Sequence, residues 1–375
     1  MTGGQQLFRL GDVLERDIEG CGEDGQPILL LAAGQTIETV RQLRQLQAAG
    51  YAVDLPEARP ARPDSRPAAE AAGTPAERAQ HEFEAKLAAA AQIRSRATRA
   101  VGELLQRFRV GNRPKTAELL DYSAALVSEV AAAPFALAAV AHLSACSDYL
   151  VEHSVDVAVL LAGMGTLQGL PPDDLARLAL AGLMHDIGLQ LIPPGILKQT
   201  GPLTAEEFQT MKKHPRYGHA ILQSCAGCPR EVALVALQHH ERMDGSGYPT
   251  GCTGEKLHPY SRLAAVAYVF DARTSDRRHA PAVSAWDALS AFHTNQRQAF
   301  DQPAVFALTK LVGVFPVGTQ VKLDSGQAGV VAAPNPEDGA TPIVRVNRDR
   351  HGIPLAYSYT LDLRESEDRI ATAWT

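Results

Sequence analysis

Apolar side chains recur every three or four residues along most of the segment from 80 to 313, and Gly or Pro residues interrupt the pattern. This spacing places the apolar residues on one face of a helix, so the segment is expected to be all-helical. The first helix is expected to be long, to span roughly the region from 80 to 110, and to end at Gly111. Its apolar positions are Phe83, Leu87, Ile93, Ala97, Val101, Leu104, Leu105 and Phe108. The helices expected after it cover 116–133, 154–169, 172–186, 204–214, 230–243, 260–276 and 303–314.

The two ends of the chain have other patterns. Residues 1–55 contain a strand-like run at 27–37 and a helical run at 38–50 that Gly50 closes, which predicts a small α+β module. Residues 56–79 mix Pro, Ala and charged residues without periodicity, which is typical of a disordered linker.

Beyond the helical segment, residues 314–375 alternate polar and apolar positions and predict a small β-barrel-like extension. Its expected strands are 319–323, 328–333, 342–347 and 356–363, and the first two are joined by a turn at Asp324, Ser325 and Gly326. The predicted fold class is mainly α, with a helical domain between two small modules.

Composition narrows the possible partners. A formal net charge of −6 gives no broad basic surface for a nucleic-acid polymer, although a local pocket for a small anion remains compatible with it. No signal peptide and no apolar run long enough to span a membrane are expected, so we predict a cytoplasmic protein without membrane insertion. The five cysteines are odd in number and irregularly spaced, which indicates reduced thiols, and Cys225 and Cys228 are not expected to have a functional role.

Five of the twelve histidines, together with one aspartate, lie in the helical segment and carry the candidate chemistry. A single buried histidine is more often structural than functional. Six such groups together suit Fe, Mn, Zn or Ni, and an Asp beside a His can bridge two ions. Two divalent ions would activate a water molecule and neutralise charge on a phosphodiester. The candidate ligands are His153, His185, Asp186, His214, His239 and His240.

The segment 239–249, "HHERMDGSGYP", adds a loop whose backbone path is set by Gly245, Gly247 and Pro249. A plain turn would explain these residues. Tyr248 on such a loop would also be able to stack on a base or offer its hydroxyl group. We find no P-loop, no GxGxxG after a strand and no GxSxG motif that would indicate another chemistry.

Several motifs occur in a fixed order: His153-Ser154, "HDIG" at 185–188, "MKKHP" at 211–215, "HHERMDGSGYP" and "VFDARTSDR" at 269–277. In this order the chain resembles the HD-GYP family, a branch of the HD phosphohydrolases that hydrolyses cyclic di-GMP at a centre of two or three metals. The resemblance covers roughly residues 145–280. It implies an HD-type helical domain.

The resemblance also assigns roles. The six candidate ligands match metal ligands, with His185 and Asp186 at the catalytic centre, and two ions such as Fe or Mn are implied. Gly247 and Tyr248 match the name-giving loop. Arg277 matches a position that contacts ligand phosphate through charge-assisted bonds.

Three positions depart from the family pattern. Leu189 stands where relatives have a Lys that reaches the scissile phosphate, Tyr268 where they have a metal-binding Asp, and Ala280 where a basic residue is expected. Asp271, one helical turn after Tyr268, is a candidate for reaching a metal or the substrate instead. Tyr149 replaces the Glu of three-metal relatives, so two metals at most are expected.

Two functions follow. The first is a metal-dependent phosphodiesterase that opens cyclic di-GMP to the linear dinucleotide pGpG and onward to GMP. The second is a non-hydrolysing receptor or interaction module that binds the nucleotide or a diguanylate cyclase (GGDEF-type) partner. An HD hydrolase for nucleoside phosphates is disfavoured because it leaves the loop unexplained. The helix at 80–110 is expected either to pair with a second subunit in a homodimer or to pack on its own domain.

Overall fold

The computed structural model describes residues 8, 12, 18–21, 27–31, 46, 51, 74–109, 115–143, 149–199, 201–275, 282–294 and 296–374. The chain divides into two compact units, Met1–Ala72 and Gly73–Thr375. In the first unit, β1 (Ile18–Cys21) and β2 (Pro27–Leu31) form an antiparallel pair. Of the helix predicted at 38–50 only Leu46 is described, and it is helical and buried. The predicted linker lies outside the described residues as far as position 73.

The second unit begins with α2 (Pro75–Arg109), a helix of 35 residues. Its start lies inside the predicted linker, which was expected to extend to residue 79. The reason is a capping box: the Glu77 N–H donates to Thr74 Oγ1 at 3.1 Å, and the Thr74 N–H donates to Glu77 Oε2 at 2.7 Å. The capping box was not recognised in the sequence because the region is rich in Pro, Ala and charged residues and has no periodic pattern.

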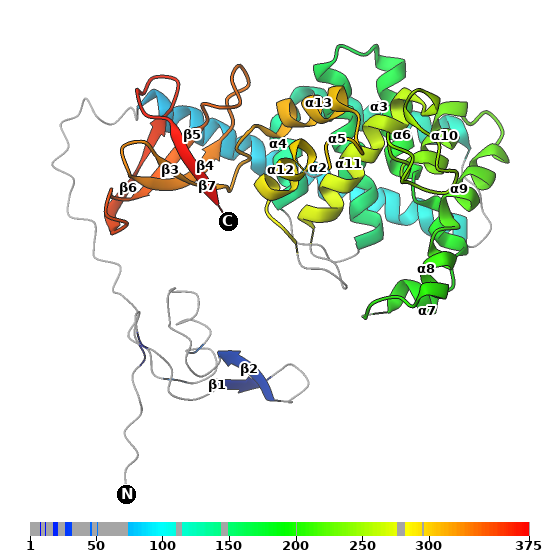
Figure 1. The fold of residues 1–375 in the computed structure, drawn as a ribbon, viewed down its shortest axis with the longest axis horizontal. Helices are drawn as coiled ribbons and strands as arrows, with labels where there is room; N and C mark the ends of the chain where they lie inside the picture. The colour runs from blue at the N-terminus through cyan, green and yellow to red at the C-terminus, as the bar shows by residue number, and fades with distance from the viewer. Residues whose placement is uncertain are drawn as a thin grey trace, which may run out of the picture. The chain divides into compact units, whose positions relative to one another are not determined.

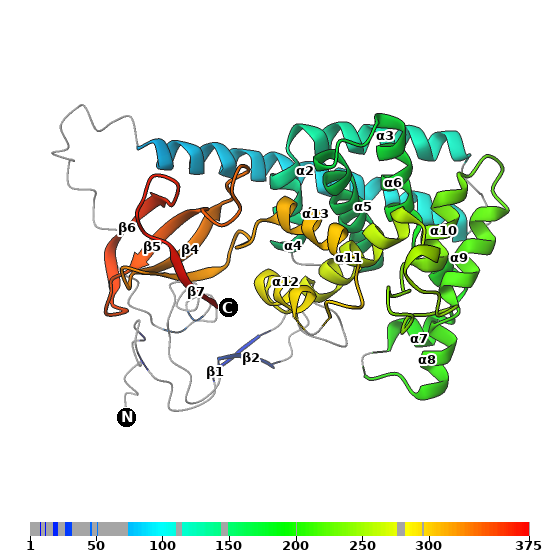
Figure 2. The ribbon, with the colours of Figure 1, turned by 45° about the horizontal axis from the view of Figure 1, so that its top comes forward.

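A bundle of helices packs around α5 (Tyr149–Leu167), which lies in the middle of the helical domain (Figures 1 and 2). Its neighbours are α2, α3 (Thr116–Ala132), α4 (Pro134–Leu143), α6 (Pro172–Met184), α11 (Pro259–Thr274) and α13 (Gln302–Val312). The remaining helical elements are η2 (Ile187–Leu191), α7 (Pro194–Lys198), α8 (Ala205–Met211), α9 (His214–Gln223), α10 (Arg230–Gln238), η3 (Gly254–Lys256) and α12 (Ala285–His293). The mainly α fold class predicted from the sequence is confirmed.

The stretch Leu150–Leu167 of α5 is apolar enough by length and composition to cross a membrane, contrary to the expectation that no run would be. Because 83% of that stretch is buried within the protein, it has the character of a core helix. The helices α3 and α4 pass the same test only when counted as one span, and they are bent by 103° at the break between them.

The C-terminal extension is a five-stranded antiparallel sheet with the order β6-β5-β4-β3-β7. The strands are β3 (Gln320–Leu323), β4 (Ala328–Ala333), β5 (Ile343–Arg348), β6 (Pro354–Asp362) and β7 (Ile370–Trp374). The predicted turn joins β3 to β4, and Gly326 has a φ of 86°, which a glycine adopts without strain. β7 was not predicted.

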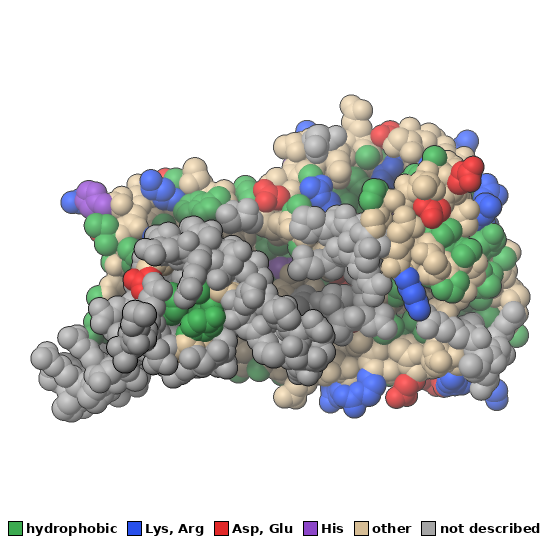
Figure 3. Space-filling model, turned by 90° about the horizontal axis from the view of Figure 1, so that it is seen from below, with side chains coloured by type: hydrophobic (Ala, Val, Ile, Leu, Met, Phe, Trp, Pro, Cys, Tyr) green, Lys and Arg blue, Asp and Glu red, His purple; other side chains and the backbone are tan. Residues whose placement is uncertain are grey.

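The sheet is fastened to α2. Arg345 of β5 forms an ion pair with Glu84 at 2.7 Å, and Thr360 of β6 donates to Gln80 Oε1 at 2.7 Å. On the face drawn in Figure 3, Lys and Arg side chains are scattered among acidic and apolar ones, as the net charge of −6 suggests.

Candidate metal centre

The six candidate ligands come from four places in the helical domain and meet at one point. His153 lies in α5, and His185 and Asp186 follow α6. His214 begins α9, while His239 and His240 directly follow α10. Their ligand atoms form two groups, each with its atoms within 4.8 Å of one another. The groups are Asp186 with His214, His239 and His240, and Asp186 with His153 and His185.

Asp186 belongs to both groups, and each of its oxygens faces different histidines. Oδ1 lies 3.2 Å from His214 Nε2 and 3.3 Å from His239 Nε2. Oδ2 lies 3.3 Å from His185 Nε2 and 3.9 Å from His153 Nε2. A carboxylate placed in this way can bridge two cations, one on each side.

The outer ring nitrogens fix which inner nitrogen can bind a metal. Nδ1 lies 2.7 Å from the Gly182 carbonyl in His185, 2.8 Å from the Met211 carbonyl in His214 and 3.1 Å from the Ala236 carbonyl in His239. A carbonyl only accepts, so Nδ1 carries the proton in each ring and Nε2 presents a lone pair to the centre. His185 Nε2 is buried and has no hydrogen-bond partner among the described residues. The Nε2 atoms of these histidines therefore fit the coordination of divalent ions.

The charges agree with this assignment. Burial lowers the pKa of His239 to about 4 and lowers the pKa of His240 well below its usual value. Burial alone would raise the pKa of Asp186, but His185, His214 and His239 hold the pKa of this carboxyl well below its usual range. At neutral pH the centre thus combines the Asp186 carboxylate with the neutral rings of His239 and His240, the protonation states that metal binding requires. His185 differs: burial would lower its pKa, but the adjacent Asp186 carboxylate raises that pKa above its usual value.

Close backbone packing positions His214. A Cβ on Gly188 would lie 2.0 Å from the His214 carbonyl oxygen and 2.5 Å from the Gly218 nitrogen. Only a glycine allows η2 to approach the start of α9 so closely. The "HDIG" motif therefore has a packing role in addition to its two polar residues.

The loop after His240 folds back on the centre. Tyr248 stacks on the His240 ring, with centroids 4.4 Å apart and planes at 18°. A Cβ on Gly247 would lie 2.4 Å from Glu241 Cα, so the glycine permits this fold. Glu241 is 1% exposed and holds the far end of the loop by accepting from Thr250 N–H at 2.7 Å and Thr250 Oγ1 at 2.6 Å.

Known proteins are similar to this chain in sequence. The HD domain family model matches residues 135–304. The chain is 36% identical over 266 residues to the cyclic di-GMP phosphodiesterase PA4108 of Pseudomonas aeruginosa, an alignment covering 70% of this chain and 64% of that protein. The HD domain of this chain is of the HD-GYP type.

Two further relatives match shorter segments. The cyclic di-GMP phosphodiesterase response regulator RpfG of Xanthomonas campestris is 39% identical over 143 residues, which is 38% of each protein. The 3'3'-cGAMP-specific phosphodiesterase 3 of Vibrio cholerae is 30% identical over 174 residues, which is 46% of this chain and 38% of that protein. The chain thus spans from 38% to 64% of the length of these three relatives.

The departures from the HD-GYP pattern lie close to the ligands. Leu189 is 8% exposed and lies in η2, where its N–H donates to the Asp186 carbonyl at 2.9 Å, so an apolar residue stands one turn after this candidate ligand. The Tyr268 ring stands edge-on to four histidines, with centroid distances of 5.2 Å to His153, 5.8 Å to His185, 5.4 Å to His239 and 4.7 Å to His240. Arg277 and Ala280 lie outside the described residues.

Asp271 is in contact with one of the candidate ligands. It is 1% exposed, and its Oδ2 lies 2.5 Å from His153 Nδ1, the ring nitrogen opposite the one that faces Asp186. The carboxylate therefore lies behind a candidate ligand, and its contact with a metal or with substrate stays a prediction. Such a carboxylate orients the imidazole and makes its other nitrogen a better donor. Sequence spacing alone showed that Asp271 shared a face with Tyr268, but not that His153 lay between it and the centre.

Replacing Asp271 by Asn is expected to weaken metal binding at the His153 side by about 10 to 100-fold, because partners that orient a ligand typically contribute that much. Metal titration of the purified variant would measure this. Asp121 on α3 is exposed, and Asp121→Asn serves as the control. Equal metal affinity in Asp271→Asn and Asp121→Asn would contradict the role given to Asp271.

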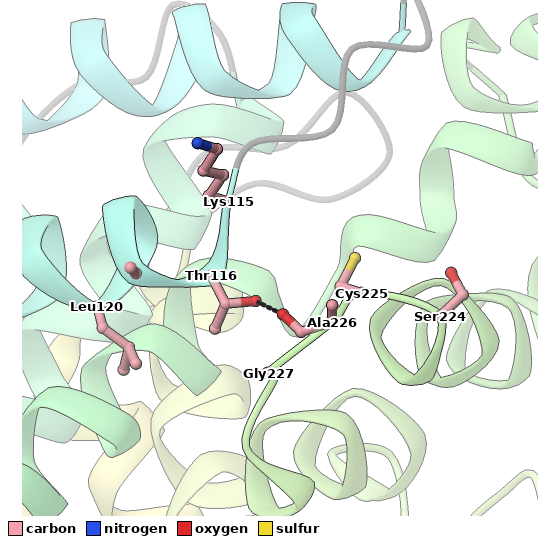
Figure 4. A pocket seen from close by; sticks show the side chains of 8 residues that line it. Lys115, Thr116, Leu120, Ser224, Cys225, Ala226 and Gly227 are labelled. Atoms are coloured by element: carbon pink, nitrogen blue, oxygen red, sulfur yellow. Dashed lines mark hydrogen bonds between the residues drawn. The ribbon is translucent and has the colours of Figure 1, made fainter.

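A surface hollow of about 620 Å³ lies apart from these ligands, between the start of α3 and the turn after α9 (Figure 4). Thr116 Oγ1 donates to the Ala226 carbonyl there at 2.8 Å. Cys225 and Cys228 in this turn are free and half-buried, and burial raises the pKa of Cys228 to about 11. A thiol with so high a pKa is a poor nucleophile at neutral pH.

Proposed function

We propose that this HD-GYP protein is a metal-dependent phosphodiesterase that hydrolyses cyclic di-GMP to linear pGpG. The observation that carries the proposal is the shared position of Asp186 between two groups of histidines, with Tyr248 stacked beside them. Two divalent ions such as Fe or Mn, one in each group, are part of the proposal. Further cleavage of pGpG to GMP is a finer expectation of the same kind.

The protein's own residues would then have distinct tasks. Ions bound in the two groups would supply an activated water and neutralise charge on the phosphoryl group. Asp186 would hold the two groups at a fixed separation, and the hydrogen bonds from Nδ1 would keep each ring aimed inward. Arg242, half-buried beside Tyr248 and Tyr268, adds positive charge on the side of the loop.

The substrate is proposed from relatives. PA4108 and RpfG are named for cyclic di-GMP, and the Vibrio cholerae relative is named for 3'3'-cGAMP. All three names describe cyclic dinucleotides with two phosphodiesters. We favour cyclic di-GMP because the relative with the widest coverage of this chain is named for it.

The test is to load the purified chain with Mn or Fe, measure bound metal by elemental analysis, and follow products from cyclic di-GMP and 3'3'-cGAMP. We expect the chain to bind metal and to form pGpG from cyclic di-GMP. Hydrolysis of cyclic di-GMP should be faster than hydrolysis of 3'3'-cGAMP. A chain that binds no metal and forms no product would refute the proposed reaction.

A second function is favoured by Leu189 and Tyr268, which place neutral side chains beside the ligands. On this alternative the chain binds cyclic di-GMP without turnover and acts as a receptor or as a partner of a diguanylate cyclase. The double substitution Leu189→Lys and Tyr268→Asp separates the two. Creation of turnover in an inert parent would support the receptor reading, whereas turnover by the unaltered chain would refute it. A cytoplasmic location, a homodimer and a GGDEF-type partner remain predictions.

A further inference from the structure

Lys212 lies against Tyr248, the residue that stacks on the candidate ligand His240. It ends α8, where its backbone N–H donates to the Phe208 carbonyl at 3.0 Å, and it stands two residues before His214. Its Nζ lies 4.8 Å from the Phe208 ring centroid and 5.2 Å from the Tyr248 ring centroid. Because Tyr248 stacks on His240, the ammonium group is held one aromatic ring away from a candidate ligand.

Lys212 differs from the neighbouring arginines in having no hydrogen-bond partner for its charged group among the described residues. Arg216 and Arg242 flank the same loop, but Arg216 donates to the Pro249 carbonyl at 3.1 Å and Arg242 to the Glu241 carbonyl at 2.9 Å. The Lys212 ammonium makes no hydrogen bond or ion pair with any residue in the described part of the chain. Two rings hold it by cation–π contact, and this leaves its N–H groups available to a ligand.

The chemistry of a cyclic dinucleotide calls for such a group. The molecule carries two phosphodiester charges, and a metal centre that acts on one of them leaves the other to be neutralised by the protein. Leu189 is apolar and buried next to Gly188, which packs on the His214 carbonyl, so it offers no donor there. Lys212 offers three donors beside Tyr248.

We propose that Lys212 is a phosphate-binding residue for the cyclic dinucleotide, with its ammonium held over Tyr248 to receive a phosphodiester oxygen. The inference rests on the proposed function and adds a binding residue to it. Lys213, the next residue, is exposed whereas Lys212 is half-buried, so the pair provides a matched control.

The experiment compares Lys212→Met, Lys213→Met and Lys212→Arg with the unaltered chain, all loaded with Mn. Binding of a hydrolysis-resistant phosphorothioate analogue of cyclic di-GMP is measured by calorimetry, with metal content and thermal unfolding as checks on the fold. Lys212→Met keeps the length of the side chain and removes its charge. We expect it to weaken binding at least about tenfold, as for loss of a charged hydrogen bond. Lys213→Met should change binding by less than about twofold, and Lys212→Arg should retain more affinity than Lys212→Met.

Equal binding by Lys212→Met and Lys213→Met, in a chain that does bind the analogue, would overturn the role of Lys212 and leave the proposed function standing. Failure of the unaltered, metal-loaded chain to bind the analogue would overturn the proposed function and this inference with it.

Discussion

Replacing Asp186 by Asn is expected to remove bound metal from both groups of the candidate centre and to lower any hydrolysis of cyclic di-GMP by more than about 100-fold. Changes to residues that only orient metal ligands already cost about 10 to 100-fold, and Asp186 is itself shared by both groups. An amide cannot supply the negative charge that two adjacent cations require. Elemental analysis of the purified variant, together with product formation, measures the effect.

Asp173 gives the control for this substitution, because it is an exposed carboxylate in the first turn of α6, the helix that leads to His185 and Asp186. Asp173→Asn should keep its metal and its activity. Full metal content in Asp186→Asn would show that the two groups of histidines do not depend on a shared carboxylate.

Replacing Gly188 by Ala is expected to destabilise the fold by about 1 to 3 kcal/mol, the usual cost of forcing a methyl group into a packed site. The added Cβ would meet two backbone atoms, the His214 carbonyl oxygen at 2.0 Å and the Gly218 nitrogen at 2.5 Å. Backbone atoms cannot rotate away as a side chain does, so η2 and α9 must separate. His214 moves with α9, and bound metal should therefore fall together with the melting temperature.

Gly195 in α7 offers the matched comparison, since a Cβ there would meet nothing within 4 Å. Gly195→Ala is expected to leave the melting temperature unchanged or raise it slightly, because Ala favours a helix over Gly. If Gly188→Ala and Gly195→Ala unfold at the same temperature, the contact between η2 and α9 is not tight in solution.

Amphipathic helices were predictable because one face of each is polar. α4 was missed for the opposite reason: residues Ala136 to Ala141 are all buried, so no polar face marks a period. α9 was not predicted because the apolar pattern indicated the end of a helix at His214, the residue where α9 begins. β7 was not predicted either, because it pairs with β3, a strand far from it in sequence, and such a pairing leaves no local signal.

The candidate ligands could be chosen from the order of motifs, and the structure brings all six together. Their binding of metal remains a prediction. Sequence spacing could not show the three-dimensional features around them: Asp271 behind His153, the Tyr268 ring among four histidines, and the ammonium of Lys212 over Tyr248. Each of these depends on contacts between elements that are distant along the chain.

The helix α2 links the C-terminal sheet to the centre (Figure 2). Near its start it carries Glu84, the ion-pair partner of Arg345 in the sheet. Ten residues later, about 15 Å along the axis, Arg94 bonds Asp156 at 2.6 Å and Glu152 at 3.0 Å, on either side of His153 in α5. The segment matched by the HD domain, 135–304, contains neither α2 nor the sheet. A truncation to that region would leave the two buried carboxylates Glu152 and Asp156 without their cation, so we expect it to be less stable than a fragment that keeps α2.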